Sequence, residues 1–322
     1  MRRTSEAIAV VLVLLGRSRA AEPPAATQPT SRAAAPTVRQ AAVAGLFYPA
    51  DPGKLKKQVD ALLASKAPAV GGPIRAMICP HAGYRYSGLT AAMAYRQLKG
   101  KDVRTVVVLA PSHTAAFRGA SIPNATQYAT PLGSVRVSPL AARLAGQAPF
   151  VRKATCRVTR PGWWRIGPKK APPPGKDTPH TWEHSLEVQL PFLQRVAKGF
   201  ELVPVVYGQV DAAAAAERLA RHLDDRTVVV ASSDLSHYHS YDVARSLDAG
   251  CRKAVRELDV RAMARQEACG KGPILTVLHL AKRNGWKPVE IDYRTSGDIP
   301  GGDKSRVVGY MSFVFVERAP RP

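Results

Sequence analysis

Three short polar clusters, each containing histidine, directly follow apolar runs of the chain. They are Cys79-Pro80-His81, Pro111-Ser112-His113 and Ser232-Ser233-Asp234-Leu235-Ser236-His237. Imidazole rings bind transition metals and transfer protons near neutral pH. A single histidine at the end of a strand is more often a hydrogen-bonded structural residue than a ligand. Three histidines at equivalent positions favour a shared functional site.

The third cluster adds a carboxylate to this set. Asp234 and His237 lie three residues apart, so they form either a metal ligand with its supporting group or an acid/base pair. The structural alternative for Asp234 is the N-cap of a helix. His239 follows closely, and we expect it to face solvent.

Two further segments carry candidate residues. His184 and Glu187 stand at a spacing of three residues, which suits metal binding on one face of a helix. The apolar residues Leu186 and Leu190 equally favour a helix that packs beside the site. Cys269 lies in a glycine-containing turn between two predicted helices, where an inert buried thiol is the first interpretation from the sequence alone.

The elements that must position these residues are predicted from hydrophobic patterning. Continuous apolar runs predict strands buried on both faces at Ile74–Cys79, Thr105–Ala110, Leu202–Tyr207, Thr227–Ala231, Val289–Tyr293 and Val307–Val316. Helical spacing occurs around Leu55 to Leu63 and along Ala212–Leu223, Val243–Arg265 and Ile274–Asn284. The pattern predicts a single α/β domain at 38–318, with helices on both faces of a central sheet. The last run predicts an antiparallel strand and hence a mixed sheet, whose strand ends form the ligand crevice.

Composition narrows the classes of function. The 322 residues are 45% hydrophobic and 22% charged, which is typical of a globular chain, and 47 basic against 24 acidic residues give a net charge of +23. The basic residues are scattered between apolar runs, so we expect no specific nucleic-acid partner. The four cysteines show no CxxC spacing, so neither a zinc knuckle nor a disulfide framework is indicated.

Two segments stand apart from this core. Residues 1–20 resemble a signal peptide and 21–37 a disordered linker, which predicts export, with a cytoplasmic protein as the alternative. The apolar stretch is too short for a stable membrane span. Residues 150–180 form a basic loop with Trp163-Trp164 and eight Lys or Arg against Asp177. This loop is either a clamp over a polyanion or a solvated insertion.

Taken together, the motifs resemble the Memo-like family, also called AmmeMemoRadiSam system protein B, from about Val38 to Val316. Six segments support the resemblance in order along the chain. They are Ala44-Gly45-Leu46-Phe47-Tyr48-Pro49, Pro80-His81-Ala82-Gly83-Tyr84-Arg85-Tyr86-Ser87-Gly88, Ala110-Pro111-Ser112-His113, Glu183-His184-Ser185-Leu186-Glu187, Ser232-Ser233-Asp234-Leu235-Ser236-His237 and Cys269-Gly270-Lys271-Gly272-Pro273-Ile274.

The resemblance implies a fold similar to the class III extradiol dioxygenases and a single transition metal ion. The implied metal ligands are His81, His113 and Cys269. Asp234 and His237 would then be catalytic, and the residues expected to contact substrate are Phe47, Tyr86 and His184. Fe(II) is the expected ion, with Cu or Zn as alternatives, because a thiolate replaces the carboxylate of the usual iron site.

The expected function is a non-haem metal-dependent oxidoreductase of unknown substrate. One alternative is a binding or scaffold protein that uses the same pocket for a peptide or small anion. A second is a zinc hydrolase, which would need a free base such as Glu187 or His237 beside the metal. The sequence leaves the substrate and the oligomeric state open.

Overall fold

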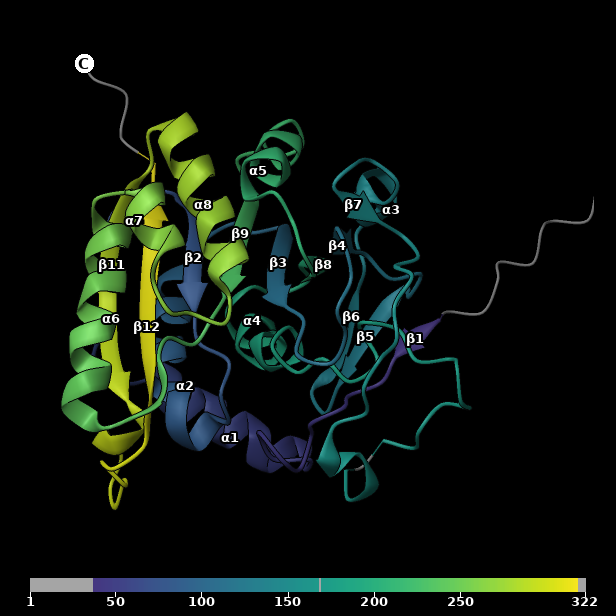
Figure 1. Ribbon diagram of the computed structural model, residues 1–322, viewed down its shortest axis with the longest axis horizontal. Helices are drawn as coiled ribbons and strands as arrows, with labels where there is room; N and C mark the ends of the chain where they lie inside the picture. The colour runs from purple at the N-terminus through teal and green to yellow at the C-terminus, as the bar shows by residue number, and fades with distance from the viewer. Residues whose placement is uncertain (1–36, 168, 318–322) are drawn as a thin grey trace, which may run out of the picture. The chain divides into compact units, whose positions relative to one another are not determined.

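The structure is a computed structural model that describes residues 37–167 and 169–317. The predicted signal peptide and nearly all of the predicted linker lie outside the described residues. The four central strands of the main sheet are parallel, in the spatial order β2 (Ile74–Cys79), β9 (Thr227–Ser232), β3 (Thr105–Pro111) and β8 (Glu201–Tyr207). The parallel order brings their carboxyl ends to one edge of the sheet (Figure 1).

Antiparallel strands extend this parallel core on both sides. β12 (Val307–Val316) pairs antiparallel with β2, and β11 (Lys287–Thr295) pairs antiparallel with β12. On the same side lies β10 (His237–His239), and beyond β8 come β4 (Ala120–Ser121) and β7 (Phe150–Val151). The predicted mixed sheet is therefore confirmed, and all six predicted strands are present in it.

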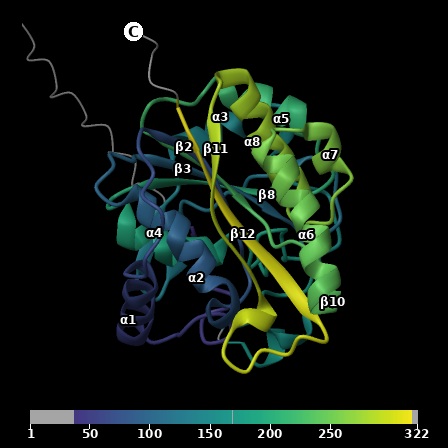
Figure 2. The same ribbon diagram turned by 90° about the vertical axis from the view of Figure 1, so that its left-hand side faces the viewer.

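Helices cover both faces of the sheet, as the sequence predicts. One face packs against α1 (Pro52–Leu63), α2 (Tyr84–Tyr95) and α4 (Leu190–Val196). The other packs against α5 (Ala212–Ala220), α6 (Tyr241–Arg256), α7 (Val260–Ala264) and α8 (Lys271–Asn284). Figure 2 shows the two groups of helices on opposite sides of the strands.

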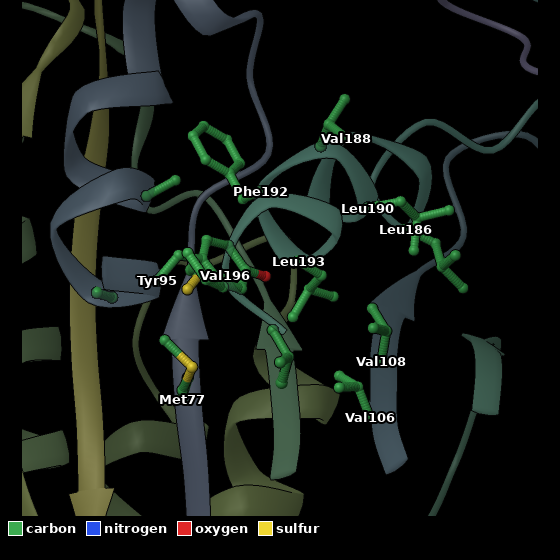
Figure 3. Close-up of a cluster of buried hydrophobic side chains, with 14 of the residues drawn as sticks. Met77, Tyr95, Val106, Val108, Leu186, Val188, Leu190, Phe192, Leu193 and Val196 are labelled. Atoms are coloured by element: carbon green, nitrogen blue, oxygen red, sulfur yellow. The ribbon is translucent and has the colours of Figure 1, made fainter. Parts of the chain in front are cut away.

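The strands supply side chains to the two faces alternately. In β3, Val106 and Val108 belong to the cluster under α2 and α4, whereas Val107 and Leu109 belong to the cluster under α8. All four side chains are fully buried. Figure 3 shows Val106 and Val108 with Phe192 and Leu193 of α4 in the first cluster. Burial on both faces explains why these strands are apolar runs in the sequence.

Local side-chain chemistry sets the helix limits. Asp51 accepts a hydrogen bond from the Lys54 amide at the start of α1, where Pro52 takes the first helical position. The predicted helix Val243–Arg265 is two helices, since Leu258 has φ 53° and Asp259 begins α7 by accepting from the Ala262 amide. The turn at Leu258 and the Asp259 cap separate α6 from α7, but they do not interrupt the helical spacing of the apolar residues.

A small second sheet and a long connection complete the fold. β1 (Val38–Arg39), β5 (Gln127–Thr130) and β6 (Gly133–Arg136) form three strands in that spatial order. α3 (Pro139–Leu144) follows. Short 3₁₀ helices occur at Arg96–Leu98, Gly162–Arg165, Glu187–Gln189 and Ser296–Asp298. Among the described residues, no helix is long and apolar enough to cross a membrane.

Candidate metal centre

The carboxyl ends of β2, β9 and β3 carry the three sequence clusters and meet at one edge of the sheet. Cys79 at the end of β2 pairs with Ser232 at the end of β9, and Leu109 of β3 pairs with Ala231 of β9. The residues that follow these strands therefore lie side by side. This register brings His81 and His113 to either side of the chain that leaves β9.

Hydrogen bonds fix both the position and the tautomer of His81. Its amide donates to the Asp234 carboxylate at 2.7 Å, and its Nδ1 lies 2.9 Å from the Ser232 hydroxyl. The Ser232 hydroxyl donates to the Ser185 carbonyl at 2.7 Å, so it accepts from Nδ1–H of the imidazole. The His81 ring is thereby left with its Nε2 lone pair free, 3.2 Å from the Cys269 thiol sulfur.

Glu183 does the same for His113. The carboxylate accepts from the His113 amide at 2.6 Å and from its Nδ1–H at 2.9 Å. It also accepts from the amide and hydroxyl of Ser185, at 2.9 and 2.7 Å. These hydrogen bonds together fix the orientation of the Glu183 carboxylate. A carboxylate on the far nitrogen of an imidazole is the usual support of a metal-binding histidine. His113 therefore also offers Nε2 to the site.

A close backbone approach brings Cys269 to the histidines. The Asp234 amide donates to the Cys269 sulfur at 3.2 Å, and the Cys269 amide donates to the Asp234 carbonyl at 3.3 Å. The next residue, Gly270, lies so near β9 that a Cβ atom would sit 2.2 Å from the Ser232 carbonyl oxygen. Only glycine fits there. The start of α8 is thus held against the end of β9.

One ring nitrogen of His81, one of His113 and the sulfur of Cys269 all lie within 4.8 Å of one another. The imidazole centroids of the two histidines are 5.2 Å apart. His81 is 2% exposed, and burial lowers its pKa, so the ring is neutral at pH 7. Burial also lowers the pKa of His113, but its bonds to Cys269 and Glu183 outweigh burial and raise it to about 10. The cluster therefore stabilises positive charge at His113.

A third imidazole borders this cluster. The His184 ring centroid lies 4.6 Å from that of His113 and 4.7 Å from that of Phe47. Burial lowers the pKa of His184 to about 4, despite the nearby Glu183 carboxylate, so the ring is neutral at pH 7. His113, Glu183 and His184 form a second group of donor atoms that lie within 4.8 Å of one another. Two of the three residues expected to contact substrate, Phe47 and His184, thus lie beside the predicted metal ligands.

Asp234 and His237 have different surroundings. The Asp234 carboxylate is buried and holds the His81 amide, and burial raises its pKa to about 6 although that hydrogen bond opposes the shift. It is not a helix N-cap, since the next element is the strand β10. His237 is half-buried, and its amide donates to the Glu267 carboxylate at 2.9 Å. Within the described part of the chain, no hydrogen bond joins the Asp234 and His237 side chains.

Glu187 lies away from the donor cluster. Its carboxylate is fully buried and pairs with the Arg39 guanidinium. It also accepts from the amides of Ala42 and Val43, at 2.7 and 3.0 Å, and from the Tyr48 hydroxyl at 2.5 Å. The helical spacing of His184 and Glu187 therefore reflects the packing of this segment against the start of the domain.

Two hollows open near the cluster. One has a volume of about 630 Å³ and is lined by Cys269 together with residues after β3 and β8. The other, of about 460 Å³, is lined by Tyr86 with Tyr238 and Arg306. Tyr86 is 44% exposed and does not line the hollow at Cys269.

Ser232 was not identified from the sequence as the residue that supports His81. Ser232 opens the cluster that ends at His237, and a serine at the end of a strand can accept a hydrogen bond from a neighbouring imidazole.

The basic connection at 150–180 packs against the rim of the site. The Thr159 amide donates to the Thr114 carbonyl at 2.7 Å, one residue beyond His113. Trp163 and Trp164 are partly buried against the core, and the Arg160 guanidinium lies over the Trp164 ring at 5.3 Å. Asp177 accepts from both Arg160 and the Trp182 indole, each within 2.8 Å. This segment therefore forms an ordered wall rather than a detached loop.

The fold and the site define an α/β protein that presents two oriented histidines and a cysteine at the carboxyl edge of a mixed sheet. The sequence profile described as Memo-like protein matches residues 39–156 and 173–314, which leaves part of the basic connection unmatched. The chain is 34% identical to MEMO1 family proteins of Sulfolobus acidocaldarius, Methanobrevibacter smithii and Archaeoglobus fulgidus. Each match covers 86% of this chain and 99% of the relative. The chain therefore belongs to the Memo-like protein family.

Proposed function

We propose that this protein is a mononuclear non-haem metal-dependent oxidoreductase, with Fe(II) or Cu held by His81, His113 and Cys269. The observation that carries the proposal is the convergence of their donor atoms within 4.8 Å. Each of the two imidazoles is held by a partner that keeps its Nε2 lone pair directed to the centre: Ser232 for His81, and Glu183 for His113.

The donor set fits a transition metal. Two imidazoles and a thiolate are soft enough for Cu and are also found with Fe and Zn. A bound cation would displace the proton that His113 holds without metal. A bound redox metal would supply electron transfer and activation of a small molecule at open coordination positions. Glu187 does not serve as the free base that hydrolysis by a zinc-bound water needs, because Arg39, Tyr48 and two amides saturate its carboxylate. His237 is then the base left for that alternative.

The surrounding residues take separate roles in this proposal. Asp234 positions the His81 peptide through its carboxylate, so it acts through a ligand. His237 is the proton-transfer residue, since its ring is half-buried and near the cluster. Phe47 and His184 form a wall that excludes water beside His113. Tyr86 contacts the part of the ligand that extends toward the second hollow.

Metal analysis of the full chain, purified without added metal, tests the site. The His81→Ala and Cys269→Ser variants are expected to lose most of the bound metal. Matched controls are His222→Ala and Cys156→Ser, which change residues outside the cluster. The proposal fails if both site variants retain the metal content of the unchanged protein.

Oxygen uptake with a panel of catechols tests the reaction. An oxidoreductase consumes O₂ with at least one reducing substrate, and the His237→Gln variant is expected to slow this uptake while keeping the metal. The alternative is a binding or scaffold protein that uses the pocket for a peptide or small anion. Full metal content without O₂ consumption in any arm would favour that alternative.

We also propose that the chain is exported, on the signal-peptide pattern of residues 1–20. Sequencing of the mature N-terminus tests this. A chain that begins at Ala21 supports export, whereas a soluble protein with an intact Met1 contradicts it.

A further inference from the structure

The hollow of about 630 Å³ is lined by Cys269 and opens at the carboxyl ends of β3 and β8. Four parts of the fold build it: the end of β3 with the segment that follows, the end of β8, the connection after β7, and the start of α8. Its lining residues are Pro111, Ser112, Ala115, Ala116, Phe117, Arg118, Thr155, Tyr207, Gly208, Gln209, Cys269, Gly272 and Pro273. A volume of this size accepts a small organic molecule.

The lining is chemically asymmetric. Phe117, the alanines and the prolines give apolar walls, and Arg118 is the one charged side chain among the lining residues. Within residues 37–167 and 169–317, no carboxylate lies within ion-pair distance of Arg118. The Gln209 side chain adds a neutral donor and acceptor. The hollow thus joins one positive charge to an apolar surface.

The backbone holds Arg118 at this place. The amide of Gln209 donates to the Phe117 carbonyl at 2.7 Å, and the Gly119 amide donates to the Gln209 carbonyl at 2.8 Å. These bonds flank Arg118 in a short parallel bridge. A Cβ atom at Gly208 would lie 2.1 Å from the Phe117 carbonyl oxygen, so the close approach needs glycine. The guanidinium therefore extends from a fixed backbone.

We propose that this hollow binds the carboxylate of a small organic acid, with Arg118 as its partner and the apolar part of the acid against Phe117 and Pro273. A guanidinium pairs with a carboxylate through two parallel hydrogen bonds. The single positive charge matches a monoanion, whereas a phosphate dianion would keep one charge uncompensated. The first turn of α8 at Gly272 adds a partial positive charge on the same side.

This inference rests on the proposed function in one respect, since the acid is a substrate only if the protein is an oxidoreductase. The acid would lie beside Cys269 and so next to the donor cluster. Binding of the acid itself requires no metal. The two proposals can therefore fail separately.

Calorimetric titration of the full-length protein with benzoate and with benzamide tests the carboxylate. The two probes have similar shape and differ in charge. We expect benzoate to bind at least about tenfold tighter, the usual loss when a charged hydrogen bond is removed. Arg118→Gln should abolish this preference and Arg118→Lys should retain part of it. The matched control Arg136→Gln changes an exposed arginine outside the hollow, and this variant should keep the full preference for benzoate.

Alkylation gives an independent measurement on chelator-treated protein. Iodoacetate and iodoacetamide both transfer their carbon to a thiolate sulfur, with iodide leaving and the thiol proton passing to buffer. Peptide mapping compares Cys269 with Cys156, which is partly buried and does not line the hollow. The rate ratio of iodoacetate to iodoacetamide should be higher at Cys269 than at Cys156. In Arg118→Gln the ratio at Cys269 should fall, while the ratio at Cys156 should stay unchanged.

Several results would overturn the inference. Benzoate that binds no tighter than benzamide, including a lack of binding by both, refutes it. A benzoate preference that persists in Arg118→Gln places the carboxylate elsewhere. Phenyl phosphate that binds tighter than benzoate refutes the assignment to carboxylates. A protein that holds no metal and still shows the benzoate preference supports this inference while the proposed oxidoreductase fails.

Discussion

The ion pair between Arg39 and Glu187 gives a sharp test of how the site is supported. The two side chains are 6% and 0% exposed. Arg39 also donates to the carbonyls of Glu183 and His180, at 2.5 and 2.9 Å, so it ties β1 to the segment that carries Glu183 and His184. Substitution Arg39→Met keeps an unbranched apolar stem and removes the guanidinium with its charge and donors.

The expected cost follows from what is left unpaired. Removal of one partner of a buried ion pair costs about 3–5 kcal/mol. Glu187 would keep its two amide donors and the Tyr48 hydroxyl, which reduces the cost of the unpaired, buried negative charge. Two buried carbonyls lose their donor, which increases the cost. We therefore expect Arg39→Met to destabilise the fold by about 3–5 kcal/mol.

Urea unfolding provides the measurement, and a surface pair provides the control. Lys56 and Asp60 form an ion pair on α1 with side chains 57% and 38% exposed, so Lys56→Met should cost about 0–1 kcal/mol. The double variant Arg39→Met with Glu187→Gln completes a mutant cycle and isolates the coupling. A loss below about 1 kcal/mol in Arg39→Met, equal to that of the surface pair, would refute the role assigned to this ion pair.

Three further predictions address the site and its frame. Glu183→Gln removes the negative charge and one of the two acceptor oxygens that His113 uses. Competition with a chelator should then show metal affinity reduced about 10–100-fold, whereas Glu267→Gln should leave it unchanged. Gly270→Ala forces a Cβ atom against the Ser232 carbonyl and should lower the free energy of unfolding by about 1–3 kcal/mol, measured in urea. Gly71 faces open space, so Gly71→Ala should cost little, and equal costs for the two variants would contradict the packing argument. Burial lowers the pKa of His180 to about 3, so the unfolded state binds its proton first, and stability should fall as pH drops below 6.5, by about 2 kcal/mol at pH 5. The loss of stability at low pH should be smaller in His180→Gln. Identical pH profiles of the variant and the unchanged protein would contradict this role of His180.

The sequence alone was sufficient to predict the strands and the type of the central sheet. Strands buried on both faces are continuous apolar runs, so all six were predicted, as was the mixed sheet. The helix at Val243–Arg265 was predicted as one, because the turn at Leu258 does not interrupt the apolar spacing. The strand-end positions of His81 and His113 followed from the same patterning. Local periodicity is a property of neighbouring residues, and it can be recognised without the fold.

Contacts between distant segments were decided by the tertiary structure. Cys269 lies 188 residues from His81 in the chain, and only the family resemblance drew attention to it before the structure brought the two within 3.2 Å. Glu187 has the spacing of a metal ligand, yet Arg39, 148 residues away, takes its carboxylate. Arg118 stood in no motif, and only the structure places it in the lining of the hollow at the strand ends. The sequence determines which side chains offer donors and charges, and the packing of strands and helices determines which of them meet, because burial assigns each polar group a partner across the chain.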